Sequence, residues 1–573
     1  MSIWEFGYAP RETSPALTCS SLQEHVNAPT FGDCASVAPY GRGMTVIASP
    51  ENLSEAPSRP WRRLPSSRLI VWVWFVSMAA VRAGTTQERD PYWEAKAGLE
   101  NLTGTPLVRP DSWSWAPVPG SFYPNSPGWN VLLGLSWLGG HYWGLFLFTF
   151  VVLLAYFGMA YVLARRLGAH PLGALAGATI GFVLALPMLS ARGTIGVQLL
   201  LWVGIFVPLW WQRRLPRTSP IGNALALFAI GAVLSAVGNW VHLSFAAMAV
   251  ALAASWGVFW LVSDWPEGGW KARLADPRRW AAALGGGLGL GVGILATPYG
   301  ISMTLERSRI TAAAGSDVII EWVPPFTPGI SAQWPFVAVS MLIVLIGVGA
   351  WFVRRLRRGP IDQTFALASA ICIMAVPFAV AGMWALRFLG VSALMLVPIL
   401  GMGVTSLGHR ARTWAQHLPD TSALKESALR WTRSRSWRIV LTLVAALLLP
   451  FAIWLGPVNH AVPEELEAIK ALPSGCRLFT TASIAGPTIL DRPDVPVWYD
   501  GRADYFGRAR LLEARGYFYG EAATSAPPGA TCVVLPVIGQ STSLPLATAR
   551  LNADPAWTLL GSYNRFDAWV RTA

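Results

Sequence analysis

Residues 142–164 read YWGLFLFTFVVLLAYFGMAYVLA, an apolar stretch that ends at the basic pair Arg165 and Arg166. A helix of about 20 predominantly apolar residues crosses the hydrocarbon core of a bilayer, so this stretch predicts a transmembrane span. Similar runs cover residues 69–81, 171–189, 194–212, 221–238, 241–263, 280–297, 335–353, 363–383, 386–407 and 439–456. Together these eleven runs predict an α-helical polytopic membrane protein.

The composition agrees with a chain that lies mostly in lipid. Of 573 residues, 53% are hydrophobic and 13% are charged, and the mean hydropathy is +0.43. The 30 Trp residues suit the headgroup level of a membrane, where indole rings are enriched. A net charge of +13 would suggest nucleic acid for a soluble domain, but in a membrane protein basic residues first report topology. We therefore expect membrane lipids, and no nucleic acid, as partners.

The distribution of basic residues predicts the orientation. With the N-terminus in the cytosol, the cytosolic segments hold 26 of the 44 Lys and Arg residues and the external loops hold 8. The remaining 10 lie after residue 456, in a region that the loop-charge rule does not govern. An odd number of spans then places the C-terminal region outside.

The N-terminal residues 1–66 show no sustained helical or strand periodicity, and we predict a disordered cytosolic tail. The first apolar run, residues 69–81, is short and is followed by small residues that resemble a cleavage site. It therefore resembles a signal peptide, but the long preceding tail favours a signal anchor.

The C-terminal residues 457–573 change character. Short β-like runs at residues 495–499 and 531–538 are separated by Gly, Pro and Asp turns, which predicts a small external α/β domain. Cys476 and Cys532 lie here, where an external location permits a disulfide that the spacing leaves open. No C-x-x-C, P-loop or G-x-S-x-G motif occurs, so thiolate metal sites, nucleotide hydrolysis and α/β-hydrolase chemistry lack sequence support.

A long external loop, residues 84–141, follows the first span of the predicted transmembrane domain, residues 67–456. A loop of this length between helices is uncommon unless it has a function. It opens with Asp90, Trp93 and Glu94. An acid directly after the first span can meet a lipid-borne substrate at the interface, so Asp90 is the leading candidate for a general base. The alternative is that Asp90 caps a helix.

Other polar residues lie at the same predicted membrane face. Asn239 and His242 fall in the turn between the fifth and sixth spans, where polar groups are costly unless they pair or line a cavity. For His242 alone, an interhelical hydrogen bond is an equally good account. Arg192 and Arg387 lie on the side where positive charge is least expected. A guanidinium there can grip a phosphate through two hydrogen bonds, or it can snorkel to lipid headgroups.

Taken in order, these motifs resemble a bacterial family within the GT-C glycosyltransferase superfamily. The family shows an Asp-led aromatic stretch after the first span, a W-x-N-x-H-G-type turn, an N-P-Y-G-type loop, an E-W-x-P-P element, a late Arg-Phe span and an external D-G-R-x-D-x-Y-G segment. The counterparts across residues 69–520 are Asp90 with Trp93, Asn239 with His242, residues 298–300, residues 321–325, Arg387 with Phe388, and residues 500–507. Two positions depart from the pattern, because Leu243 replaces a glycine and Thr297 replaces an asparagine.

The resemblance implies a GT-C-like bundle in the bacterial plasma membrane that moves a sugar from a polyprenyl-phosphate or polyprenyl-diphosphate donor to an envelope glycan, lipid or protein. It places the catalytic acid in the first external loop, so Asp90 would deprotonate the acceptor hydroxyl as this attacks the anomeric carbon with inversion. Arg387, with Arg192, would hold the departing lipid phosphate. The other substrate-binding candidates are Trp93, Glu94, Asn239, His242, Tyr299 and Glu321. Diphosphate-using relatives can take a divalent cation, but the sequence shows no paired-carboxylate ligand set.

Two other functions fit the sequence less well. A non-catalytic carrier or flippase for a lipid-linked glycan would place polar residues through the membrane midplane, whereas these spans hold their charges mainly at their ends. An envelope assembly protein would use the external domain to bind partners, with residues 500–507 as a binding edge. The simpler account of that segment is that Asp500 and Arg502 brace the domain internally.

Overall fold

The computed structural model describes most of the chain after residue 66. The described residues are 67–84, 89–186, 189–263, 274–306, 309, 319–328, 330–358, 361–417, 436–454, 461–519, 524–537 and 545–572. They fall within one compact unit. The predicted N-terminal tail, residues 1–66, lies outside the described residues.

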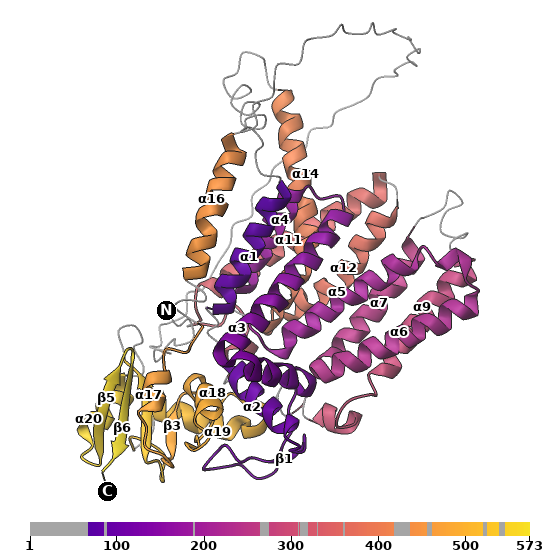
Figure 1. Cartoon of the computed structure of the whole chain (residues 1–573). Helices are drawn as coiled ribbons and strands as arrows, with labels where there is room; N and C mark the ends of the chain where they lie inside the picture. The colour runs from indigo at the N-terminus through magenta and orange to yellow at the C-terminus, as the bar shows by residue number, and fades with distance from the viewer. Residues whose placement is uncertain are drawn as a thin grey trace, which may run out of the picture. The chain divides into compact units, whose positions relative to one another are not determined.

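Every apolar run identified in the sequence contains a helix (Figure 1). These helices are α1 (Ser67–Gly84), α3 (Pro127–Arg166), α4 (Pro171–Ala185), α5 (Gly193–Trp211), α6 (Pro220–Val241), α7 (Phe245–Val262), α9 (Pro277–Gly293), α11 (Gln333–Arg358), α12 (Gln363–Ala381), the pair α13 (Arg387–Met395) and α14 (Val397–Gln416), and α16 (Ser436–Ile453). Among the described residues, six helices are long and apolar enough to cross a membrane, or seven if α13 and α14, bent by 56°, form a single span. The fold is therefore that of a helical multi-pass membrane protein.

Several helices begin where the sequence supplies a cap. The side chain of Ser219 accepts a hydrogen bond from the backbone N–H of Gly222 at 3.0 Å, and Pro220 occupies the first turn of α6. Asp276 caps α9 in the same way, with Pro277 after it. A cap satisfies a backbone donor that has no partner within the helix, and proline fits the first turn because its missing N–H is not needed there.

Helices α6 and α9 pack backbone to backbone through glycines. A Cβ atom on Gly231 of α6 would lie 2.7 Å from the carbonyl oxygen of Gly286 in α9. Small residues let transmembrane helices approach this closely, and the gain is in van der Waals packing. The glycine-rich sequence of α9 is therefore a packing surface.

The predicted loop at residues 84–141 is largely ordered. It contains α2 (Asp90–Leu102), the short strands β1 (Arg109–Pro110) and β2 (Ser121–Phe122), and the first part of α3. Helix α3 is broken at Gly140 and His141, whose backbone is not helical. The apolar run 142–164 starts directly after this break.

The C-terminal residues form a small mixed domain. Its elements are α17 (Leu466–Lys470), β3 (Leu478–Thr480), α18 (Ala482–Asp491), α19 (Ala503–Tyr519), β4 (Cys532–Pro536), α20 (Pro545–Ala553), β5 (Trp557–Tyr563) and β6 (Phe566–Arg571). The sheet order is β3-β4-β6-β5; β3 and β4 are parallel and the other neighbours are antiparallel. A disulfide joins Cys476 to Cys532, a pairing that the sequence alone left open. We refer to residues 461–572 as the C-terminal domain.

The C-terminal domain shares its hydrophobic core with the first loop. Trp93, Trp113 and Phe122 of the loop belong to the same buried cluster as Phe479 and Trp498 of the domain. A shared core means that neither part buries its apolar surface alone. The loop and the domain are therefore one packing unit.

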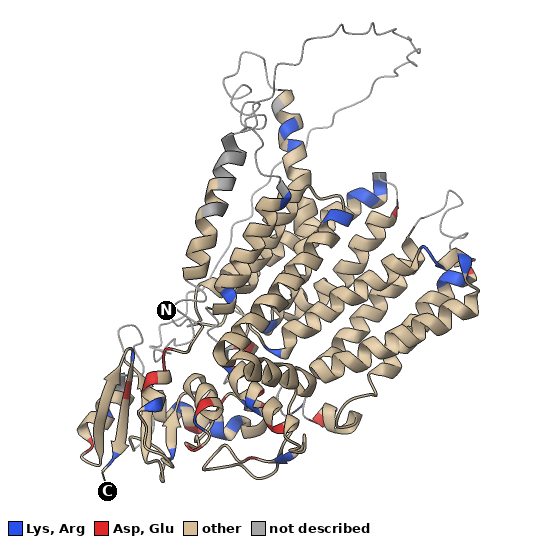
Figure 2. Cartoon of the chain, in the orientation of Figure 1, with Lys and Arg blue, Asp and Glu red and all other residues tan. Residues whose placement is uncertain are grey.

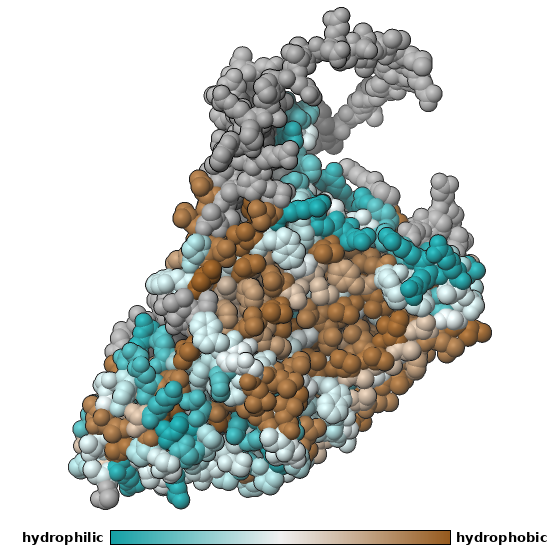
Figure 3. Space-filling view, viewed as in Figure 1, coloured by the Kyte–Doolittle hydropathy of each residue, from teal (hydrophilic) through white to brown (hydrophobic). Residues whose placement is uncertain are grey.

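Charged and apolar side chains separate along the helices. Figure 2 shows Lys and Arg at one end of the helices, where the sequence predicts cytosolic loops. Figure 3 shows a hydrophobic band across the visible face of the helices, with hydrophilic side chains on both sides of it. This pattern is expected of a chain that spans a bilayer.

Candidate active site at the start of helix α2

Asp90 lies in the first turn of α2 and is paired on both carboxylate oxygens. Its Oδ2 is 2.6 Å from Nη2 of Arg192, and its Oδ1 accepts a hydrogen bond of 3.1 Å from the indole N–H of Trp93. The side chain of Asp90 is 13% exposed. Burial raises the pKa of Asp90 above its ordinary value, while the charge of Arg192 limits the rise. Asp90 is thus a shielded carboxylate of increased basicity.

Arg192 links Asp90 to a second acid. It is the residue before α5, and its Nη1 is 3.4 Å from Oε1 of Glu321 in the short helix η4 (Ile320–Trp322). The side chains of Arg192 and Glu321 are 22% and 15% exposed. Three segments that are far apart in the sequence therefore meet in a row of alternating charges, Asp90, Arg192 and Glu321.

Arg387 lies beside this row because η4 packs against the start of α13. The guanidinium carbon of Arg387 is 4.6 Å from the centre of the Trp322 ring, which suits a cation–π contact. Phe388 meets the same ring edge to face, and the backbone N–H of Leu386 donates to the carbonyl of Val323. Arg387 therefore contacts Trp322, the residue that directly follows the Glu321 that binds Arg192.

His242 completes the group in the turn between α6 and α7. Burial, together with the charges of Arg387 and Arg192, lowers the pKa of His242 to about 3, so the ring is neutral at physiological pH. Its Nδ1 accepts a hydrogen bond of 3.0 Å from the backbone N–H of Ser244. A neutral imidazole that accepts at Nδ1 carries its proton on Nε2. His242 is therefore an uncharged donor close to two arginines.

The other sequence candidates make contacts of a different kind. The buried amide of Asn239 donates to the backbone carbonyls of Gly293 and Ile294 at the end of α9, both at 3.2 Å. Tyr299 donates to the carbonyl of Pro124 at 2.6 Å, and Glu94 is buried within α2. The structure thus groups Asp90, Trp93, Arg192, His242, Glu321 and Arg387, and it ties Asn239 and Tyr299 to backbone at the edges of that group.

Two features near Asp90 were not expected from the sequence. Gly501 of the C-terminal domain lies so close that an ideal Cβ on it would be 3.1 Å from Cγ of Asp90 and closer still to Oδ1. Arg89, the residue before Asp90, pairs with Glu465 of the C-terminal domain, with Nε 3.0 Å from Oε1 and Nη2 3.2 Å from Oε2. Gly501 lies in the D-G-R segment that resembles the family motif, and Arg89 directly precedes Asp90, but nothing in the sequence indicated that either residue connects the C-terminal domain to the start of α2.

Residues 500–502 act as an internal brace, the simpler of the two accounts that the sequence offered. The guanidinium of Arg502 is fully buried and binds Asp500 in bidentate fashion, with Nη2 2.7 Å from Oδ2 and Nε 2.8 Å from Oδ1. Its Nη1 is 3.0 Å from Oδ1 of Asp111 in the first loop. The brace therefore joins the C-terminal domain to the loop that carries Asp90.

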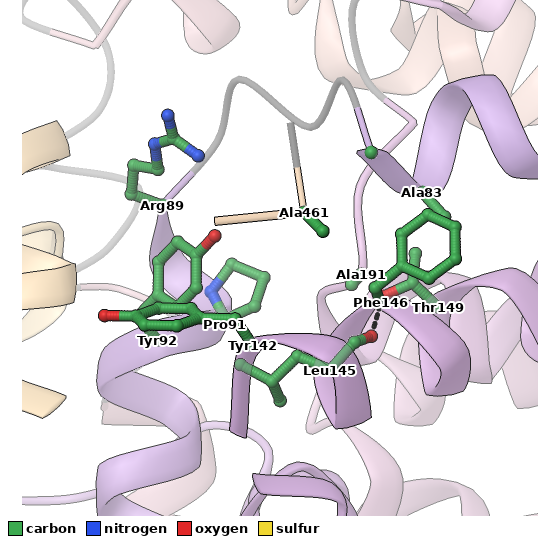
Figure 4. Close-up of a pocket in the computed structure, with 11 residues that line it drawn as sticks. Ala83, Arg89, Pro91, Tyr92, Tyr142, Leu145, Phe146, Thr149, Ala191 and Ala461 are labelled. Carbon is green, nitrogen blue, oxygen red and sulfur yellow. Dashed lines mark hydrogen bonds between the residues drawn. The ribbon is translucent and has the colours of Figure 1, made fainter. Parts of the chain in front are cut away.

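A pocket lies at the start of α2 (Figure 4). It lies between the end of α1, the start of α2 and the part of α3 after its break. Arg89, Pro91 and Tyr92 flank Asp90 in sequence and line this pocket, opposite Tyr142 and Phe146. Asp90, His242 and Arg387 do not line it, so the pocket and the charged group are neighbours that share the start of α2.

The charged group does not resemble a metal site. Asp90 and Glu321 both face Arg192, and within the described ranges no group of three or more His, Cys, Asp or Glu side chains is placed to hold a metal ion. Oxygen-rich sites for Mg²⁺ or Ca²⁺ need several such ligands. The described side chains of this group therefore do not form a divalent-cation site by themselves.

The chain is similar to two solved enzymes. An oligosaccharyltransferase from Archaeoglobus fulgidus, tethered with an acceptor peptide, shares 12% identity over 84% of this chain and 72% of that chain, with a TM-score of 0.47. ArnT from Cupriavidus metallidurans in the apo state shares 13% identity over 88% of this chain and 97% of that chain, with a TM-score of 0.49. The same ArnT bound to undecaprenyl phosphate shares 12% identity over 88% of this chain and 97% of that chain, with a TM-score of 0.44.

No family model and no curated protein matches the chain. These solved structures share no more than 13% identity with the chain, and their TM-scores do not exceed 0.49. At this identity and these TM-scores they assign no substrate and no catalytic residue to the chain.

Proposed function

We propose that this chain is an inverting membrane glycosyltransferase that moves a sugar from a polyprenyl-phosphate-type donor to an acceptor hydroxyl of the cell envelope. The observation that supports this most directly is the pairing of Asp90 with Arg192 at 2.6 Å; Arg192 also contacts Glu321, and the next residue, Trp322, stacks against Arg387. Transfer of a sugar from a phosphate donor to a hydroxyl needs a base for the hydroxyl proton, and cations stabilise the phosphate that leaves.

Asp90 acts as the general base. The acceptor hydroxyl gives its proton to Oδ2 of Asp90 while its oxygen forms a bond to the anomeric carbon. The bond from that carbon to the phosphate oxygen breaks, and the phosphate leaves with the electron pair. Because burial raises the pKa of Asp90, its carboxylate takes up a proton more readily than an exposed one, and such a base contributes about 10² to 10⁴ in rate.

Arg192 couples the two halves of the reaction. While Asp90 is ionised, it neutralises much of the charge of Arg192. Once Asp90 is protonated, that charge becomes available to the phosphate oxygen, which gains negative charge at the same moment. A preorganised cation that acts where charge develops stabilises the transition state. Arg387 provides a second cation, and the Nε2–H of His242 provides an uncharged donor.

We place the site on the external face of the bacterial plasma membrane. The lower density of Lys and Arg in the loops on the Asp90 side supports this orientation. The disulfide between Cys476 and Cys532 supports it independently, because the domain that carries it packs on the same loop and disulfides persist in oxidising compartments. The donor would then reach Asp90 from the outer leaflet.

The test is turnover of defined lipid-linked sugars by the purified full-length chain. Undecaprenyl-phosphate-linked hexoses, aminohexoses and pentoses are incubated with envelope extracts, and released undecaprenyl phosphate is measured by mass spectrometry. Wild-type protein should release it, and Asp90→Asn should be slower by about 10² to 10⁴ because the amide cannot accept the proton. Asp276→Asn, at the N-cap of α9, is the matched control and should keep wild-type turnover. Equal turnover by Asp90→Asn and wild type would remove Asp90 as the base.

A further inference from the structure

The C-terminal domain touches the Asp90 carboxylate through a residue without a side chain. An ideal Cβ on Gly501 would lie 3.1 Å from Cγ of Asp90, nearer to Oδ1, and 3.2 Å from Nε1 of Trp93. Real Cβ atoms essentially never approach other atoms as closely as this one would approach Oδ1. Only glycine therefore lets the domain backbone reach the hydrogen bond between Trp93 and Asp90.

The backbone at Gly501 is held in place on both sides. Asp500 and Arg502 flank it, and their buried ion pair extends to Asp111 of the first loop. The guanidinium carbon of Arg502 also lies 4.4 Å from the centre of the Trp113 ring. A buried charge that loses a partner is strongly destabilised, so this segment has little freedom to move away from Asp90.

A second glycine of the same domain approaches the preceding residue. An ideal Cβ on Gly486 in α18 would lie 2.5 Å from the carbonyl oxygen of Arg89. The side chain of Arg89 pairs in turn with Glu465 of the domain. The domain therefore contacts the start of α2 at Arg89 and at Asp90, from two separate elements.

We propose that the C-terminal domain is an integral part of the Asp90 site, and that Gly501 is a positioning residue that keeps the carboxylate of Asp90 between Trp93 and Arg192. The contact itself is independent of the reaction, while its catalytic consequence rests on the glycosyltransferase function proposed above. A side chain at position 501 displaces the carboxylate from the Trp93 indole and from Arg192. The base then loses its orientation toward the acceptor.

The first experiment compares Gly501→Ala with Gly516→Ala. Gly516 lies in α19 of the same domain and has no atom within 4 Å of an added Cβ, so its substitution controls for a change of glycine in the domain. Gly501→Ala should lower kcat by about 10²-fold with a smaller change in KM, because a misplacement of about 1 Å costs that much. Gly516→Ala should keep wild-type kcat.

Carbodiimide labelling of carboxylates, read by mass spectrometry, gives a measurement that does not depend on turnover. Labelling of Asp90 should rise in Gly501→Ala and stay at the wild-type level in Gly516→Ala. Glu465 reports the integrity of the domain, because it is buried and paired with Arg89, and its labelling should stay low in both variants. Unchanged labelling of Asp90 together with unchanged kcat in Gly501→Ala overturns the proposal.

A cysteine pair tests the contact even if Gly501→Ala folds poorly. Cγ of Asp90 lies where a cysteine sulfur would lie, 3.1 Å from the ideal Cβ of residue 501, within the short separations that a disulfide requires. The double variant Asp90→Cys with Gly501→Cys should form a disulfide on mild oxidation, detected as a cross-linked peptide pair. Asp90→Cys with Gly516→Cys should not. Absence of the first cross-link overturns the proposal. If the cross-link forms but the wild-type protein turns over no lipid-linked sugar, the contact is supported and only the transferase function is rejected.

Discussion

Arg502 of the C-terminal domain and Asp111 of the first loop form a buried ion pair, with Nη1 of the arginine 3.0 Å from Oδ1 of the aspartate. Their side chains are 0% and 1% exposed. Asp500 binds the same guanidinium, so one cation faces two carboxylates. This cluster lies inside the hydrophobic core that the loop and the domain share. It joins two segments that are far apart in the sequence into one unit.

Replacing Arg502 should destabilise that unit. Arg502→Met fills a similar volume but leaves Asp500 and Asp111 buried without a cation, and breaking a buried pair costs roughly 3–5 kcal/mol. The free energy of unfolding, measured with denaturant on detergent-solubilised protein, should fall by that order. Arg565→Met is the control, since the Arg565 side chain is 69% exposed and 4.0 Å from Glu464. Equal stability of Arg502→Met and wild type would contradict the structural role of the pair.

Arg192 should resist conservative replacement. Its two terminal nitrogens contact different acids, Nη2 contacting Asp90 and Nη1 contacting Glu321. Lysine carries a single point charge and cannot reproduce a planar fork that spans both carboxylates. We expect Arg192→Lys to lower the rate of sugar transfer by at least about tenfold, as for loss of an oriented cation. Arg309→Lys, at an exposed pair with Glu306, should not change it. A wild-type rate for Arg192→Lys would show that charge alone is enough at this position.

Glu321 should matter less for the rate than Arg192. Glu321→Gln removes one of the two carboxylates that neutralise Arg192 and leaves the pair with Asp90 in place. The negative charge of Glu321 raises the pKa of Asp90, so its removal lowers the pKa of Asp90 and makes Asp90 a weaker base. In a plot of kcat against pH, the fall in rate on the acid side should therefore occur at lower pH than in wild type. A shift in the opposite direction would show that Glu321 does not act through Arg192.

The sequence predicted the helices and the members of the charged group better than it predicted their setting. Apolar runs of bilayer length leave few structures other than helices, and each run contains one. Asp90, Arg192, His242, Glu321 and Arg387 stood out because polar groups at span ends need a partner, and the structure brings them together. The sequence predicts eleven spans, whereas only six or seven of the described helices are long and apolar enough to be spans.

The contacts made by the C-terminal domain had no sequence signal. Gly501 belongs to the D-G-R segment that resembles the family motif, but its approach to Asp90 depends on the chain returning to α2 from far along the sequence. Asp111 lies in the first loop and Arg502 in the C-terminal domain, so their pairing depends on the tertiary fold. The contacts of Asn239 could not be predicted either. Its amide bonds to backbone carbonyls of another helix, and the sequence does not distinguish this role from binding a ligand.

His242 should make the protein less stable in acid. The pKa of His242 is about 3 in the folded chain and about 6.5 in an unfolded one, so between these values the unfolded chain binds a proton that the folded chain does not. Stability due to this residue is therefore lost as pH falls through 6.5 toward 3 and is unaffected above 6.5. In His242→Gln the drop in melting temperature between pH 7.5 and pH 5 should be smaller than in wild type. His417→Gln, at an exposed position, should leave that drop unchanged, and an equal drop in His242→Gln would show that His242 is not held neutral.

The disulfide between Cys476 and Cys532 should stabilise the C-terminal domain and report its compartment. It closes a sequence separation of 56 residues next to the parallel pair β3 and β4, and removing such a link typically costs about 2–5 kcal/mol. The double variant Cys476→Ser with Cys532→Ser should therefore melt at lower temperature than wild type. In intact cells both cysteines should be protected from alkylation until a reductant is added, because a disulfide persists only on the oxidising side. Alkylation of both thiols without reductant would place the domain in the cytosol, and with it the loop that carries Asp90.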